Sequence, residues 1–474
     1  MKTYVLNNKR LTDRIDVQFY DPEYFQTIKL LSDTAKSDED YEIAEIRNIL
    51  SKKEKDITSG ATPLGATYLE EGIPFIRVQN VRKNRLKLSN VKFIPKFIHE
   101  GDLKRSQLKP DDVLLTITGM TYGLSAIVPE DLKEANMNQH SVRIRVDTGK
   151  IFPKLLSMFL NSKLGKIQSD RFVTGSTRPA LDYEAVRSIK ILFPKSHAKQ
   201  EQIVKETEKY LKIAYAKRSE FKKELFKCIS LISDKLGVEI KEHKVQTFIL
   251  NTEGKTLNRL DCYSHSPAYR KIISGLKNAE KNKKCDLMKG NDLSIMTDKI
   301  SMEKNRSHVY RYIDIGNTEK ELGSIQGHQE DVLINLPSRA RQIIRENDIL
   351  LPRPIGSTEG IIIVPKKYDG QLASTGFIQI RPKNHDEAVL LWAILKSSAV
   401  QEQLFYLQSG SLQPEITPKV FMKRVLIPFP NDKIKEDIIK QIKESFIKLQ
   451  ELQKEQTKNT ELADEIFVDA LLKV

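Results

Sequence analysis

The chain has 474 residues, with 78 Lys and Arg against 63 Asp and Glu, and a formal net charge of +15. A chain of this length is too long to fold around one ordinary hydrophobic core, so we expect two or more domains. The basic excess favours a polyanionic partner, nucleic acid ahead of a membrane. The cysteines at 228, 262 and 285 lack metal-ligand spacing, and no apolar run could span a bilayer, so we expect a reduced, soluble, cytoplasmic protein.

The first part of the chain combines short strand patterns with a helix pattern. Residues 75–78 and 141–146 alternate apolar with polar side chains, as half-buried strands do. Leucines predict a helix between residues 151 and 169. From Arg77 to Lys109 there are ten Lys or Arg against two acids. Such a run is consistent with a merely solvated surface, but beside the global charge it indicates a phosphate-facing surface.

Two long stretches predict long amphipathic helices, each carrying one apolar stripe. Lys199 to Lys235 contains no Gly or Pro and would be about 55 Å long at 1.5 Å per residue. Its stripe is Ile203, Tyr210, Ala214, Phe221, Leu225, Cys228 and Ile232. The stripe of the segment from Lys433 to Leu471 is Ile442, Phe446, Leu449, Gln453, Gln456, Thr460, Ala463, Phe467 and Ala470. We expect the two helices to pair, with the polar positions fixing their register; two independent surface helices are the alternative.

The remainder of the chain nearly repeats itself. Residues 112–115 correspond to 348–351, the glycine turn 119–123 corresponds to 356–360, and a Pro-ended apolar strand stands before each long helix. We therefore predict an α/β protein with two globular modules in tandem, each followed by a long helix. The expected boundaries are 1–195 for the first module, 196–240 for the central helix, 241–431 for the second module and 432–474 for the C-terminal helix.

Recognisable catalytic motifs are missing. The chain contains no Pro-Pro dipeptide, such as a base-amino methyltransferase loop carries, and Gly254-Lys255-Thr256 lacks the glycine five residues earlier that a phosphate-binding loop needs. Asp111, Asp131 and Lys133 could hold a metal and activate water for phosphodiester cleavage. That pattern is short, however, and the repeat places Asn347 where Asp111 stands. We expect no catalytic, cofactor or metal site in the chain.

The order of several segments resembles the specificity subunit of type I restriction-modification enzymes. These segments are residues 57–63, 72–81, 112–115, 118–119, 138–140, 175–177 and 191–194. The resemblance covers nearly the whole chain, although the second module lacks the Thr-Pro turn and the Ile-Pro-Phe-Ile-Arg run of the first. It implies two target-recognition domains in tandem, separated by two long antiparallel helices that form a coiled coil, and no catalysis by this chain.

The same resemblance implies a DNA-binding role in phage defence. Each domain would read one half of a bipartite double-stranded DNA target, and the helices would dock methyltransferase (modification) subunits, with restriction/translocase subunits joining outside. S-adenosylmethionine, ATP and Mg would belong to those partners. Candidate base-contacting residues are Arg77, Gln79, Asn80, Thr118, Thr121, Tyr122, Arg178, Arg311, Arg353, Ser357, Thr358 and Gln413. The alternatives are a stand-alone nuclease or modification enzyme of a defence system, and a coiled-coil scaffold that binds only protein.

Overall fold

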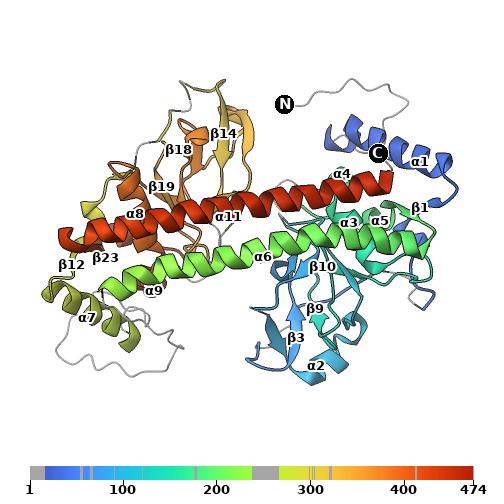
Figure 1. Cartoon of the computed structure of the whole chain (residues 1–474), viewed down its shortest axis with the longest axis horizontal. Helices are drawn as coiled ribbons and strands as arrows, with labels where there is room; N and C mark the ends of the chain where they lie inside the picture. Colours follow the sequence, from blue (N-terminus) through green and yellow to red (C-terminus); the bar gives the residue numbers. More distant parts are fainter. Residues whose placement is uncertain are drawn as a thin grey trace. The chain divides into compact units, whose positions relative to one another are not determined.

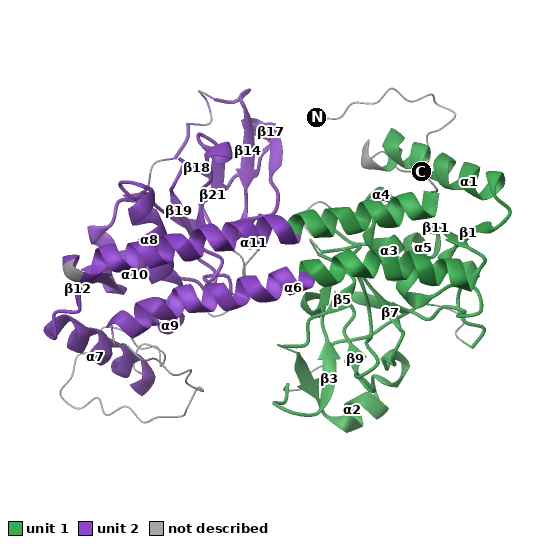
Figure 2. Ribbon diagram, viewed as in Figure 1, with its two compact units in different colours: residues 1–214, 457–474 green, residues 215–456 purple. Residues whose placement is uncertain are grey.

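The computed structural model in Figure 1 divides into two compact units. The first unit comprises Met1–Ala214 and Thr457–Val474, and the second comprises Tyr215–Gln456 (Figure 2). The structure describes residues 17–53, 57–63, 68–89, 91–119, 121–175, 179–236, 266–297, 299–301, 303, 305–319, 323–410 and 414–472. No helix in these ranges is long and apolar enough to cross a membrane.

In its described residues, the first unit mixes short strands with five α-helices besides the long ones. The helices are α1 (Pro22–Ser37), α2 (Lys96–Glu100), α3 (Pro153–Asn161), α4 (Lys163–Phe172) and α5 (Tyr183–Arg187). The strands are β1 (Tyr41–Glu45), β2 (Thr58–Ser59), β3 (Ile73–Ile76), β4 (Val81–Arg82), β5 (Arg85–Leu86), β6 (Lys92–Ile94), β7 (Val113–Thr116), β8 (Ser125–Ile127), β9 (Asn136–Met137), β10 (Ser141–Ile144) and β11 (Lys190–Pro194). Their sheets have the orders β1-β11, β2-β10-β7-β8, β6-β3-β9 and β4-β5.

The second unit contains the same kinds of element. Its helices are α7 (Pro267–Lys281), α8 (His385–Lys396), α9 (Ser398–Tyr406) and α10 (Pro418–Arg424). Its strands are β12 (Cys285–Lys289), β13 (Ile295–Met296), β14 (Val309–Ile313), β15 (Thr318–Glu319), β16 (Ser324–Ile325), β17 (Gln329–Val332), β18 (Ala340–Ile343), β19 (Ile349–Pro352), β20 (Ile362–Ile363), β21 (Leu372–Ser374), β22 (Phe377–Ile380) and β23 (Leu426–Pro430). Their sheets have the orders β12-β23, β13-β22-β19-β20, β17-β14-β21-β18 and β15-β16.

The two units share one chain path, and the class is mixed α/β as predicted. Each unit has a four-stranded sheet, β2-β10-β7-β8 or β13-β22-β19-β20, whose second and third strands are fully buried. In each, one short parallel pair occurs, β3 with β9 and β14 with β21. The first helix of each unit begins at a proline after a capping residue, Asp21 or Ser266, whose side chain accepts a backbone hydrogen bond. The repeated sequence segments therefore correspond to repeated structure.

The two long helices are α6 (His197–Leu236) and α11 (Asp432–Leu472), and each contributes residues to both units. Within the second unit they run antiparallel. Lys217 pairs with Glu455 at 2.9 Å, Lys448 with Glu224 at 2.7 Å, and Lys235 with Asp437 at 2.8 Å, all between Nζ and a carboxylate oxygen. The predicted stripe residues Ile203, Ala214, Phe221, Cys228, Ile232, Ile442, Leu449, Ala463 and Phe467 are buried. Residues 237–240, assigned to the central helix from the sequence, lie outside the described ranges.

A buried polar contact fixes the register of this helix pair in the second unit. One carboxylate oxygen of Glu224 accepts a hydrogen bond from the Ser445 hydroxyl, and the other accepts one from Lys448 Nζ, each at 2.7 Å. Burial by itself raises the pKa of the Glu224 carboxyl, but these two donors bring it below its ordinary value. A shift of one helix by one turn would move Ser445 and Lys448 away from this buried carboxylate, which opposes sliding.

Candidate nucleic-acid interface

Four segments that carry the sequence resemblance lie together in the first unit. We define the motif cluster as residues 57–63, 118–119 and 138–140, together with residues 174–175 and 179–180, which flank a stretch outside the described residues. The Thr62 hydroxyl donates to Gln139 Oε1 at 2.8 Å. The Thr118 hydroxyl lies 2.7 Å from His140 Nδ1. Segments far apart in sequence are therefore held in contact by their side chains, and Thr118, a predicted site residue, belongs to this cluster.

Close backbone approach explains the glycine of the first motif. A Cβ at Gly60 would lie 1.6 Å from the carbonyl oxygen of Met137, far inside van der Waals contact. The neighbouring Ser59 hydroxyl accepts a hydrogen bond from the Tyr183 hydroxyl, and the backbone N–H of Gly119 donates to Pro179 O at 2.9 Å. The cluster is thus a packed junction of loops rather than an open set of side chains.

The turn between Gly119 and Gly123 presents the next two predicted residues. Both glycines have positive φ, +79° and +82°, which this turn requires. The Tyr122 hydroxyl donates to Asp170 Oδ1 at 2.7 Å, and Lys166 Nζ lies 4.4 Å from the centre of the Tyr122 ring. The Tyr122 side chain therefore holds the turn against α4. Thr121, the residue before it, is half-buried.

Residues 77–80 form a tight turn after β3. The Asn80 side chain is 2% exposed; its Oδ1 accepts from the Arg77 N–H at 3.0 Å and its Nδ2 donates to Lys87 O at 2.9 Å. In the second unit, Asn317 Oδ1 accepts the equivalent hydrogen bond from the Asp314 N–H at 2.9 Å. An asparagine therefore shapes this turn in both units. Gln79 is exposed. The Arg77 guanidinium lies 5.5 Å from the centre of the Tyr68 ring.

The basic run from Arg77 to Lys109 divides into two groups by exposure. The half-buried group is Arg77, Arg82, Lys83, Arg85 and Lys87. The exposed group is Lys92, Lys96, Lys104, Arg105 and Lys109. In the first group, Lys83 pairs with Asp464 of α11. Burial raises the pKa of the Asp464 carboxyl, and the charge of Lys83 partly offsets this rise. The exposed cations lie on β6, α2 and the segment after it, where they are able to meet phosphates.

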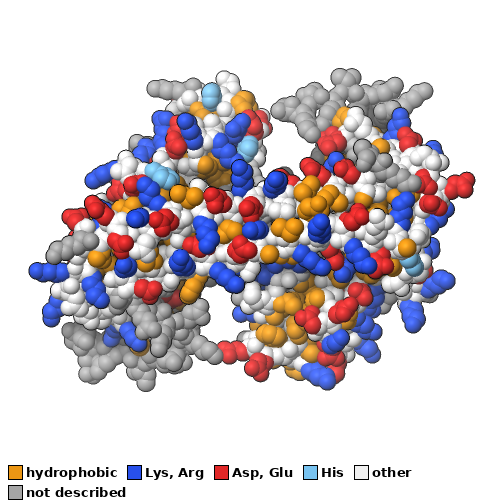
Figure 3. Space-filling view, viewed as in Figure 1, with side chains coloured by type: hydrophobic (Ala, Val, Ile, Leu, Met, Phe, Trp, Pro, Cys, Tyr) orange, Lys and Arg blue, Asp and Glu red, His pale blue; other side chains and the backbone are white. Residues whose placement is uncertain are grey.

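The charge elsewhere on the visible surface is mixed. Figure 3 shows Lys and Arg side chains interspersed with Asp and Glu along both long helices. Several of these acids and bases form ion pairs, such as Lys205 with Glu201 at 2.8 Å. A surface of alternating sign attracts a polyanion less strongly than a surface with an excess of cations.

In the second unit, the predicted arginines Arg311 and Arg353 form ion pairs within the protein, and the Arg311 side chain is exposed. The Arg311 Nε lies 3.7 Å from a carboxylate oxygen of Glu330. Arg353 pairs with Glu415 and also donates from Nη1 to Thr375 O at 3.1 Å. Ser357 is half-buried and Thr358 is 6% exposed. Arg178 and Gln413 lie outside the described residues. Base contact by each of the candidate residues stays a prediction.

An ion pair between a buried aspartate and a partly exposed arginine occurs in both units and was not predicted from the sequence. Asp112 accepts from Arg145 Nε at 2.6 Å and Nη2 at 3.0 Å, and Asp348 accepts from Arg381 Nε and Nη2 at 2.8 Å each. The acid follows a residue with φ of +68° in each case, Asp111 or Asn347. The signal in the sequence was the aspartate that opens both Asp-apolar-Leu-Leu strands.

The acids proposed for a nuclease are explained by local structure. Asp111 occupies a left-handed position that Asn and Asp tolerate best, as its counterpart Asn347 does. Asp131 is exposed. Among the described residues, no group of three or more His, Cys, Asp or Glu is placed to hold a metal ion.

We expect the double substitution Asp111→Asn, Asp131→Asn to leave DNA cleavage and methylation by a reconstituted complex within a few-fold of the parent. Asparagine keeps the turn, because Asn347 already adopts the same φ in the second unit. Cleavage of a plasmid carrying the target is the measurement. A complete loss of cleavage, with DNA binding and folding intact, would restore the nuclease hypothesis.

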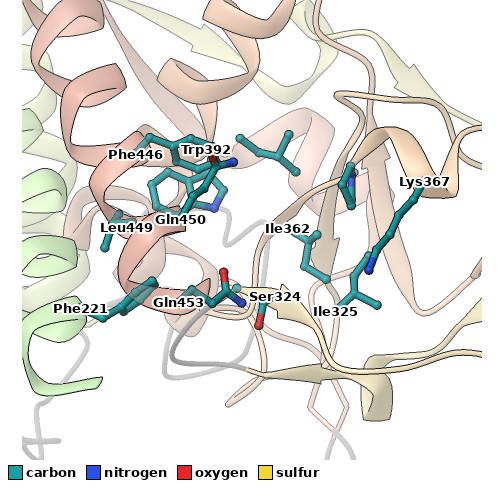
Figure 4. Close-up of a pocket in the computed structure, with 13 residues that line it drawn as sticks. Phe221, Ser324, Ile325, Ile362, Lys367, Trp392, Phe446, Leu449, Gln450 and Gln453 are labelled. Atoms are coloured by element: carbon teal, nitrogen blue, oxygen red, sulfur yellow. The ribbon is translucent and has the colours of Figure 1, made fainter. Parts of the chain in front are cut away.

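The second unit also contains a cavity of about 280 Å³ beside the long helices (Figure 4). Phe221, Phe446, Leu449 and Trp392 give it apolar walls, and Gln450, Gln453 and Lys367 supply polar groups. Lys367 is the one titratable side chain in this lining, so no pair of titratable groups faces the cavity.

The α/β scaffold of the first unit thus carries a packed junction of loops and a group of exposed cations. Residues 38–223 match the family model described as Type I restriction modification DNA specificity domain. This match confirms, for residues 38–223, the resemblance drawn from the sequence. That family is non-catalytic, and catalysis lies in partner subunits.

Solved structures of low sequence identity are also similar to the chain. The S subunit of a type I restriction-modification system from M. genitalium is 13% identical over 91% of this chain and 96% of that chain, with a TM-score of 0.38. The HsdS subunit from Thermoanaerobacter tengcongensis is 14% identical over 91% and 96%, with a TM-score of 0.32. A structure described by complex assembly and conformational transition of the type I R-M system is 12% identical over 91% and 97%, with a TM-score of 0.35. No curated protein matches the chain.

Proposed function

We propose that the chain is the DNA-recognition subunit of a type I restriction-modification complex. The globular part of each unit reads one half of a bipartite double-stranded DNA target. The paired helices α6 and α11 dock the methyltransferase subunits, and restriction/translocase subunits join that assembly. S-adenosylmethionine, ATP and Mg are used by those partners, and the chain itself carries out no chemistry.

The observation that carries this proposal is the duplicated scaffold with different surfaces. Both units have the same order in the four-stranded sheet and the same Asp–Arg ion pair. At matching positions after β3 and β14, however, one unit carries Arg77 and the other Asp314, which pairs with Arg339 at 2.6 Å. A constant frame that displays different side chains is suited to reading two different sequences.

Exchanging the segment from about Ile57 to Pro194 with that of a relative is expected to change only one half of the recognised sequence. This segment holds the sheets β2-β10-β7-β8 and β6-β3-β9 but none of the second unit. Sequencing of the sites methylated by the reconstituted complex provides the measurement. Simultaneous change of both halves would contradict independent reading by the two units.

Two further assays separate this proposal from its alternatives. DNA cleavage by the isolated chain would favour a stand-alone nuclease. A protein-only scaffold would show no DNA binding, whereas a recognition subunit should bind with an affinity that falls steeply as salt rises, because phosphate contacts release counterions. The slope of log affinity against log salt counts those contacts.

A further inference from the structure

Each unit exposes one large apolar side chain at the same point of its scaffold. In the first unit, β6 runs antiparallel to β3 and leads into α2, on which Phe97 is 73% exposed. In the second unit, β17 runs antiparallel to β14 and leads into a 3-10 turn, Leu333–Asn335, on which Ile334 is 43% exposed. Both edge strands flank the strand that forms the parallel pair of its unit.

The register of the strands makes Phe97 and Ile334 equivalent. Lys92 of β6 faces Phe75, and Gln329 of β17 faces Tyr312. Each apolar residue then follows five positions after that edge-strand residue. Single exposed apolar side chains are common on protein surfaces, but recurrence at one position of two divergent units indicates a shared use.

The turn that carries Phe97 is rigidly anchored beneath the exposed ring. Ile98 and His99, the next two residues, are 6% and 5% exposed. Asn136 Nδ2 donates to Leu103 O at 3.0 Å and lies 3.2 Å from His99 Nδ1, and its Oδ1 accepts from the Ser106 hydroxyl at 2.6 Å. This buried network joins α2 to β9, so Phe97 projects from a fixed platform rather than from a loose loop.

The second platform is tied down by its backbone. Leu333 is fully buried, and its N–H donates to His308 O at 2.9 Å. The N–H of Ile334 itself donates to Arg306 O at 3.2 Å. The exposed side chain is thus again held on a fixed main chain.

The charges around Phe97 fit a polyanion. Its neighbour Lys96 is exposed, and α2 packs against the turn Lys104–Ser106, which exposes Lys104 and Arg105. Glu100, at the end of α2, pairs with Lys96 at 3.5 Å. Cations that hold phosphates beside a projecting apolar side chain are the arrangement that proteins use to insert a wedge between base pairs.

We propose that Phe97 and Ile334 act as apolar wedges, each inserting at a base step in or beside the half-site read by its own unit. Resting on the proposed function, this assigns part of the recognition to DNA deformation. Steps that unstack easily are favoured at the wedge, which adds specificity without a hydrogen bond to a base edge.

The experiment uses the full chain reconstituted with its methyltransferase subunits. Methylation mapping first gives the bipartite sequence. Duplexes then carry 2-aminopurine at each position in turn, except at the methylated bases, and its fluorescence rises where stacking is lost. The variants are Phe97→Ala, Phe97→Leu and Ile334→Ala. The control is Leu30→Ala on α1, where Leu30 is 45% exposed, close to Ile334.

We expect wild-type complex to raise fluorescence at one step near each half-site. Phe97→Ala should abolish the signal at the first half-site alone and weaken binding about tenfold or more, from the apolar contact that is lost. Phe97→Leu should retain most of the signal, Ile334→Ala should remove only the second, and Leu30→Ala should change neither.

Two results would overturn the wedge. One is a wild-type complex that methylates its bipartite target without raised fluorescence at any position; the proposed function would then stand alone. The other is a Phe97→Ala complex that binds DNA normally but loses its methyltransferase subunits, which would make this surface a protein contact. Absence of sequence-specific methylation by the wild-type complex would instead contradict the proposed function.

Discussion

Replacing Asp348 with alanine is expected to lower the free energy of unfolding of the second unit by about 3 kcal/mol. Its carboxylate is fully buried and accepts from Arg381, from the Arg345 N–H at 2.7 Å and from Gln379 Nε2 at 2.7 Å. The substitution leaves all three donors without this acceptor, and a buried donor without a partner is costly. Urea unfolding followed by circular dichroism measures the loss.

A surface acid in the same unit provides the control. Asp437 also forms an ion pair, with Lys235 at 2.8 Å, and this lysine is the main cause that lowers the pKa of the Asp437 carboxyl. Its side chain is 54% exposed, so water replaces the partner when the pair is broken. Asp437→Ala should leave the urea midpoint nearly unchanged. If both variants lost the same free energy of unfolding, burial would not explain the contribution of the Asp348 ion pair to stability.

The sequence was most informative about features with a short period. The stripe of α6 follows helical spacing, and its residues Phe221, Cys228 and Ile232 are buried as that spacing predicts. The strand at residues 112–115 was recognisable because its sequence recurs in the second half. The first signal depends on neighbours in the chain and the second on repetition within the sequence, so both can be read without the structure.

Contacts between distant residues could not be read in this way. The sequence suggested Gln453, Gln456 and Thr460 as the polar positions that fix the register of the long helices. In the second unit a buried contact of Glu224 with Ser445 and Lys448 has that role. In the sequence Glu224 is one of many charged residues of α6, and only the partner helix, more than two hundred residues away, makes it a buried anchor.

The same limit applies to the candidate DNA contacts. Arg353 is a predicted base contact, and the sequence did not reveal that its guanidinium binds Glu415 and the Thr375 carbonyl. Nor did it reveal that the Asn80 side chain, another predicted contact, holds the turn after β3. Polar side chains that shape loops and those that read bases are of the same types, so their roles are separated only by their three-dimensional partners.

A four-residue insertion after Ala216 in α6 is expected to change the spacing of the recognised half-sites but not their sequences. Ala216 lies at the boundary between the units, upstream of the contacts of Lys217 and Glu224 with α11. Four residues add about one helical turn, or 6 Å, and rotate the following stripe by only about 40°, so it can still be buried. Mapping the methylated sites gives the spacing.

The size of the change follows from the geometry of DNA. A length of 6 Å corresponds to one or two base pairs at about 3.4 Å each, so the unspecified gap should lengthen by that amount. A matched insertion of four residues after Gln456 as well lengthens α11 at the same boundary and should relieve any mismatch between the helices. The gap should then change in the same direction with better assembly.

A two-residue insertion at the same position distinguishes length from phase. It rotates the downstream stripe by about 200°, which would turn Phe221, Cys228 and Ile232 away from α11. Burying Glu224 against Ser445 and Lys448 would also become impossible, so pairing and assembly should fail although the helix is only about 3 Å longer. If the four-residue insertion altered the half-site sequences and left the gap unchanged, helix length would not set the spacing, and readout would depend on a contact that the insertion moved.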